Sequence, residues 1–83
     1  MNETQYYVIV APLGTRAASG LARRTYTGAG PVDESLTRDL TWRLDSAIVE
    51  WEYGDLGAEL VRISEQEADN LTQAFRGRWG RAR

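Results

Sequence analysis

Residues 63–76 read Ile-Ser-Glu-Gln-Glu-Ala-Asp-Asn-Leu-Thr-Gln-Ala-Phe-Arg, and they predict a helix that carries its own start signal. Ser64 and Glu67 form a capping box, in which each side chain accepts a hydrogen bond from the other residue's backbone N–H. Ile63 and Ala68 stand at the two positions of a hydrophobic staple, which fixes how the chain enters the helix. The helix is therefore expected to begin directly after Ser64.

The apolar residues of this helix recur at helical spacing. Ala68, Leu71 and Phe75 form one stripe, which Trp79 would extend. Such a stripe has to be buried against another element, because a short helix gains most of its stability from packing. Gly77 is the position at which we expect the helix to end, since glycine is common just past a helix C-terminus.

Several extended segments precede the helix. Residues 6–12 are continuously apolar and rich in β-branched and aromatic types, which is typical of a buried strand. Residues 21–27 predict a second strand, paired with the first in an antiparallel hairpin. Gly and Pro interrupt the chain at 28–31, and the polar residues 32–39 are expected to be irregular. Alternation of apolar and polar residues over 40–44 indicates a third strand with one buried face.

Residues 45–57 allow two interpretations. In the first, a short helix over 47–53 is capped by Asp45 or Ser46. In the second, the alternation around Trp51 makes this segment a strand. We favour the helix, after which residues 58–63 form a last extended segment.

The predicted fold is a single α+β domain over residues 1–76. It has a small antiparallel sheet of three or four strands, a C-terminal helix packed on one face of the sheet and a short helix before it. Residues 77–83 form an arginine-rich C-terminal tail. The expected core consists of Tyr7, Ile9, Leu21, Trp42, Leu44, Ile48, Trp51, Leu60, Ile63, Ala68, Leu71 and Phe75.

Two short motifs stand in the second half of the chain. Gly-Asp-Leu at residues 54–56 follows an acidic segment, and Ile-Ser-Glu-Gln-Glu-Ala follows at residues 63–68. This order resembles that of small uncharacterised actinobacterial proteins, over residues 47–76 and, in outline, over the N-terminal hairpin. The resemblance supports a helix at 47–53 and implies no activity and no functional residue.

The composition argues against most catalytic chemistry. The 83 residues include no cysteine and no histidine, which excludes a Ser–His–Asp triad, a Cys–His pair and a histidine or thiolate metal site. The acids of residues 45–69 are spaced as on a solvated face, and the nucleotide-binding glycine fingerprints are absent. We expect no catalytic residue, no metal and no cofactor. A small carboxylate-dependent enzyme or accessory subunit stays open as a minor alternative.

Location is inferred from what the sequence lacks. No run of residues approaches the length of a membrane span, and Met1 to Gln5 has no basic signal-peptide start. The lack of cysteine fits a reducing compartment. We therefore expect a cytoplasmic protein that does not bind a membrane.

The charges are strongly segregated. Residues 33–71 carry eleven acids against three arginines, a balance of −8, whereas residues 72–83 carry four arginines and no acid. Arginines beside aromatic residues can contact phosphates and stack on bases, so nucleic-acid binding is one hypothesis. Its candidate residues are Arg23, Arg24, Tyr26, Arg43, Arg76, Arg81 and Arg83.

The leading hypothesis is a non-catalytic protein-interaction or regulatory module. An open sheet of short strands has edges that accept a partner strand. The chain also has three tryptophans and four tyrosines, more than a small core readily covers. Tyr53, Arg78 and Trp79 are the candidate anchors, because these residue types are enriched in interfaces. The partner is a protein or a second copy of the chain, which would form a homodimer.

Overall fold

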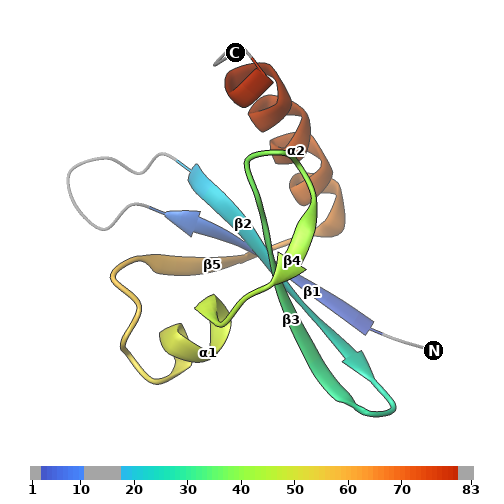
Figure 1. The fold of residues 1–83 in the computed structure, drawn as a ribbon, viewed down its shortest axis with the longest axis vertical. Coiled ribbons are helices and arrows are strands. Elements are labelled where there is room, and N and C mark those ends of the chain that lie inside the picture. Colours follow the sequence, from blue (N-terminus) through green and yellow to red (C-terminus); the bar gives the residue numbers. More distant parts are fainter. Residues whose placement is uncertain (1–2, 11–17, 81–83) are drawn as a thin grey trace.

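The computed structural model describes residues 3–10 and 18–80, which form one five-stranded antiparallel sheet and two helices (Figure 1). This confirms the α+β class, the short helix and the C-terminal helix, but the sheet has five strands rather than three or four. Its strands follow the order β4-β3-β2-β1-β5. The elements are β1 (Glu3–Val10), β2 (Ala18–Thr27), β3 (Gly30–Leu36), β4 (Trp42–Leu44), α1 (Ala47–Glu52), β5 (Glu59–Ile63) and α2 (Glu65–Gly80).

Strand β3 is the element that the sequence pattern does not indicate. Residues 32–36 were expected to be irregular because they are polar. In the structure, Arg23 of β2 lies directly opposite Glu34 of β3, and Arg24 lies opposite Asp33. Opposite charges at directly paired positions stabilise an antiparallel pair. The acids of β3 are therefore compatible with a strand because β2 supplies an arginine to each of them.

Both faces of the central strand β2 are covered, and each face has its own core. Leu21 and Ala22 are adjacent in sequence, point to opposite faces and are fully buried. Leu21 belongs to a cluster with Leu36 and Phe75, under α2. Ala22 belongs to a second cluster with Ile48 and Leu60, under α1. The two helices accordingly lie on different sides of the strands (Figure 1).

Helix α2 begins as predicted and ends later than predicted. The capping box is confirmed, since Ser64 N–H donates to Glu67 Oε1 at 3.0 Å and Glu67 N–H donates to Ser64 Oγ at 3.1 Å. The predicted stop at Gly77 is wrong, because α2 continues to Gly80. Residues 77–80 of the predicted tail are thus helical, and residues 81–83 lie outside the described part of the chain.

Trp79 holds the last turn of α2 to the domain, because it packs against the core cluster that includes Leu21 and Leu36 of the sheet. It stacks on Phe75 with ring centroids 4.6 Å apart and an interplanar angle of 5°. The guanidinium carbon of Arg38, in the β3–β4 loop, lies 5.7 Å from the centroid of the Trp79 ring. Trp79 is therefore part of the packing under α2.

Strand β4 is shorter than the alternation of residues 40–44 predicts. Leu40 has a φ of +65°, which places it in a turn rather than in an extended segment. Leu44 was expected in the core but is 78% exposed, because β4 is an edge strand and α2 does not reach its end. Leu40 and Trp42 pack against the α2 core, and the Trp42 ring lies edge-on to the ring of Tyr6 at 6.2 Å.

We predict that Phe75→Ala destabilises the domain by about 3–5 kcal/mol, because it removes a fully buried ring and leaves a cavity under α2. Urea unfolding followed by circular dichroism measures the loss. Gln73→Ala on the exposed side of the same helix is the matched control and is expected to change stability by less than about 0.5 kcal/mol. Equal effects of the two substitutions would contradict the packing described here.

The capping box also predicts a pH dependence. Hydrogen bonds from the backbone and side chain of Ser64 lower the pKa of Glu67 below its ordinary value. A carboxyl group whose pKa is lower in the folded state than in the unfolded state stabilises the fold. This contribution is fully present at pH values above the unfolded-state pKa, and it is lost as the pH falls through the folded-state pKa.

We therefore expect Glu67→Gln to lower the melting temperature at pH 7 and to reduce its further decline below about pH 4.3. Thermal unfolding by circular dichroism between pH 7 and pH 3 measures both effects. Glu65→Gln, in the same exposed first turn, serves as control. A Glu67→Gln profile parallel to that of the unsubstituted chain would show that the cap does not titrate with folding.

Candidate protein-contact surface

Helix α1 forms at the position where the sequence left helix and strand open. Ala47 N–H donates to Asp45 Oδ2 at 3.1 Å, and the Ser35 hydroxyl donates to the same oxygen at 2.7 Å. Asp45 therefore satisfies the first turn and ties it to β3. Ile48 is buried against Ala22 and Leu60. The predicted short helix is confirmed over Ala47–Glu52, and Asp45 fixes its start.

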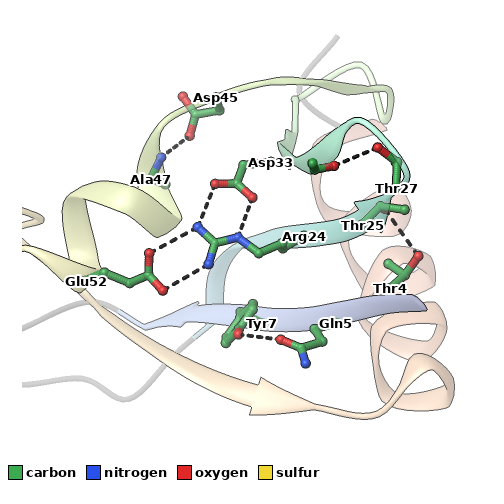
Figure 2. A network of polar contacts seen from close by, with 11 residues as sticks. Thr4, Gln5, Tyr7, Arg24, Thr25, Thr27, Asp33, Asp45, Ala47 and Glu52 are labelled. Carbon is green, nitrogen blue, oxygen red and sulfur yellow. Dashed lines mark hydrogen bonds and ion pairs between the residues drawn. The ribbon is translucent and has the colours of Figure 1, made fainter. Parts of the chain in front are cut away.

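The guanidinium group of Arg24 fixes the other end of α1. Its Nε and Nη2 atoms donate to the two carboxylate oxygens of Asp33 at 2.7 and 2.9 Å. Its Nη1 and Nη2 atoms donate to Glu52 at 2.9 and 3.1 Å. Figure 2 shows the guanidinium group between the two carboxylates. Three elements, β2, β3 and α1, are thus held by one side chain.

Burial makes this pairing stronger than a surface ion pair. The side chains of Arg24 and Asp33 are 11% and 12% exposed, whereas that of Glu52 is 47% exposed. Hydrogen bonds to Asp33 and then to Glu52 raise the pKa of Arg24 above its already high ordinary value, so it stays charged. Of the two contacts of Arg24, the ion pair with Asp33 is the stronger, and the contact with Glu52 orients helix α1.

With Ile48 and Glu52 directed to the sheet, α1 exposes its outer side. Val49 and Tyr53 are four residues apart and share that side. Val49 is 38% exposed, and Tyr53, directly after the helix, is 79% exposed. Trp51, expected in the core, is 37% exposed, although its ring lies 5.9 Å from that of Tyr7. Helix α1 therefore presents apolar and aromatic groups to solvent.

Strand β5 provides the second exposed feature. It pairs with β1 over five residues, and no other strand of the described chain pairs with its outer edge. Leu60 is buried under α1, whereas Val61, on the α2 side, is 42% exposed. Glu59 and Arg62 are exposed as well. An outer edge of this length leaves backbone N–H and C=O groups available for pairing.

The predicted anchors do not form one site. Tyr53 lies on the α1 side, while Arg78 and Trp79 belong to α2 on the other side of the sheet. Trp79 is packed against Phe75. Arg78 Nη1 donates to the carbonyl oxygen of Ala18 at 3.3 Å. Tyr53 and Arg78 are exposed, whereas Trp79 is partly buried.

The predicted nucleic-acid residues are also divided between the two faces. Arg23 lies on the α2 side, where its Nε is 2.8 Å from Glu34 Oε1 and its guanidinium carbon is 4.2 Å from the centroid of the Trp42 ring. Arg24 and Tyr26 lie on the α1 side, where Arg24 is held by Asp33. The two neighbouring arginines are therefore engaged within the domain and point in opposite directions.

Two further predicted arginines, Arg43 and Arg76, lie on other elements of the described chain. Arg43 on β4 is 69% exposed and its Nη2 is 3.9 Å from Asp39 Oδ2, a weak contact. Arg76 is exposed on α2. Arg81 and Arg83 lie outside the described residues. The structure does not bring Arg43 and Arg76 together with Arg23 and Arg24.

Sequence reasoning named no residue of β5 as a contact residue. The sequence predicts an extended segment around Val61 but not whether its side chain is exposed, because no local sequence pattern indicates which strand lies at the edge of a sheet. A partial signal exists: Glu59 and Arg62 are charged residues in a short strand, which is common at edges.

Comparisons of the chain with protein-family models, with curated proteins and with solved structures found no match. Neither helix of the described residues is long and apolar enough to cross a membrane. Among residues 3–10 and 18–80, no three acids lie together as a metal-ion site would require.

We predict that Arg24→Met destabilises the domain by about 3 kcal/mol, because it leaves the buried carboxylate of Asp33 without its cation. Glu52→Gln is expected to cost less than about 1 kcal/mol, because Glu52 is half exposed and Asp33 still pairs with Arg24. Urea unfolding at neutral pH measures both. A larger cost for Glu52→Gln than for Arg24→Met would contradict the assigned order of the two contacts.

Proposed function

We propose that this chain is a non-catalytic cytoplasmic module that works by protein contact, and that it joins its partner through the outer edge of β5. The observation that carries the proposal is an edge of five residues beside an exposed valine, Val61. An extended partner segment can add to such an edge through main-chain hydrogen bonds. The absence of cysteine from the chain fits a reducing compartment.

The other edge of the sheet is less suited to strand addition. Strand β4 has three residues, against five in β5. Both edges carry exposed charged residues, Arg43 on β4 and Glu59 and Arg62 on β5, so the length of the strand is what separates them. Charged residues and short length are two devices by which proteins keep an edge unpaired. The geometry therefore favours β5 as the edge that receives a partner.

A second copy of the chain is the partner that we propose. A domain of 83 residues buries a modest fraction of its surface, so self-association adds stability that the monomer lacks. A pair of edge strands from two copies is antiparallel and two-fold symmetric, which is the commonest geometry of small homodimers. The module is thus a homodimer in this proposal.

Nucleic-acid binding receives less support from the geometry. The hypothesis needs Arg23 and Arg24 on one accessible surface, free to contact phosphates. Instead, each of them pairs with a carboxylate of β3. Phosphate binding at these positions would have to break two internal ion pairs, one of which is largely buried.

We expect Val61→Arg to weaken self-association by about tenfold or more, because it puts a charge at the pairing edge of each copy and removes an apolar contact. Size-exclusion chromatography with light scattering, from low micromolar to millimolar protein, measures the dissociation constant.

Val49→Arg is the matched control, since it makes the same chemical change at a valine of similar exposure on α1. It is expected to leave the dissociation constant unchanged. A chain that stays monomeric over the whole concentration range, or a dimer equally weakened by both substitutions, would refute the proposal.

A further inference from the structure

We infer that two copies of the chain pair their β5 strands in one register, with Val61 directly opposite Val61 of the second copy, so that the two sheets join into one ten-stranded sheet. This inference rests on the proposed function and specifies its geometry. It follows from three properties of β5: the face of each side chain, the charge of each residue and the length of the strand.

The faces limit the possible registers. Residues Glu59, Val61 and Ile63 point to the α2 side, since Val61 pairs with Val8 and Ile63 belongs to the α2 core. Leu60 and Arg62 point to the α1 side. Two antiparallel copies in one sheet are related by a two-fold axis perpendicular to it, which keeps each face on its own side. Directly opposite residues must therefore share a face, so the axis passes midway between one residue of β5 and the same residue of the second copy.

Charge and length then separate the three central registers. An axis at Arg62 places two arginines directly opposite each other, which is destabilising, and pairs three residues of β5. An axis at Leu60 pairs Glu59 with Val61 and again uses three residues. An axis at Val61 pairs all five residues of β5 and puts no like charges opposite each other.

The register centred on Val61 also uses the exposed groups of the edge. The two Val61 side chains, each 42% exposed in the single chain, cover one another on the α2 side. Each Arg62 lies opposite Leu60 of the other copy on the α1 side, where its aliphatic stem packs over the edge of the core. Glu59 lies opposite Ile63. In the joined sheet both α2 helices stand on one face and both α1 helices on the other.

Single-cysteine variants test this arrangement. Because the chain has no cysteine of its own, any disulfide that forms must join the introduced cysteines of two copies. Directly opposite residues of an antiparallel pair have Cβ atoms about 5 Å apart, close enough for a disulfide after a small adjustment. Under copper-phenanthroline oxidation, Val61→Cys is expected to form a covalent dimer at least about tenfold faster than Val49→Cys, since dimerisation raises the effective thiol concentration.

Mixed samples identify the register. A mixture of Glu59→Cys and Ile63→Cys chains is expected to form covalent heterodimers, while each variant alone does not. Denaturing gel electrophoresis and mass spectrometry measure the products, and circular dichroism confirms that each variant is folded. Rapid cross-linking of Val61→Cys together with the Glu59–Ile63 heterodimer supports the inference.

Different experimental outcomes refute the proposed function and the proposed register. If light scattering shows a dimer but Val61→Cys cross-links no faster than Val49→Cys, the register centred on Val61 is wrong. Cross-linking between Val61→Cys and Ile63→Cys chains in a mixture would indicate the register centred on Arg62 and would also overturn the inference. If the unsubstituted chain stays monomeric at every concentration, the proposed function itself fails.

Discussion

The bidentate pairing of Arg24 with Asp33 is the interaction on which the rest of the domain depends. It joins β2 to β3 at a point where β3 carries two neighbouring acids, Asp33 and Glu34, which would be unfavourable in a strand without cations opposite them. The same guanidinium group binds Glu52 and so holds α1 against the sheet. A lysine has a single charged nitrogen and could not bind both carboxylates in this flat, forked geometry. The position therefore requires arginine for a structural reason.

Once α1 and α2 are in place, the domain has little central surface left for a partner. The two helices cover opposite faces of β2, where Leu21 and Ala22 are fully buried. The exposed apolar groups accordingly lie at the periphery: on α1 and directly after it, beside the two edges of the sheet at Val61 of β5 and Leu44 of β4, and at Tyr26 near the end of β2. This distribution favours recognition at an edge over binding in a cleft, and it directs the functional proposal to Val61.

The candidate site was only partly accessible from the sequence. Tyr53 was predicted as an exposed anchor and is exposed, because it follows a short helix whose inner side is fixed by Ile48 and Glu52. Arg78 and Trp79 were predicted on the same grounds, yet Trp79 packs on Phe75. Residue type alone cannot distinguish these cases, since an aromatic ring serves equally well in a core and in an interface.

The sequence by itself determined the features that depend on neighbouring residues: the start of α2 at Ser64 and Glu67, its apolar stripe through Phe75, and the α+β class. Tertiary structure decided the rest. Strand β3 exists because two arginines lie across from its acids, α2 extends to Gly80 because Trp79 packs against the cluster that includes Leu21 and Leu36, and β5 is an edge because of the order of strands. Each of these outcomes depends on groups far apart in the chain, whose pairing energy no local pattern contains.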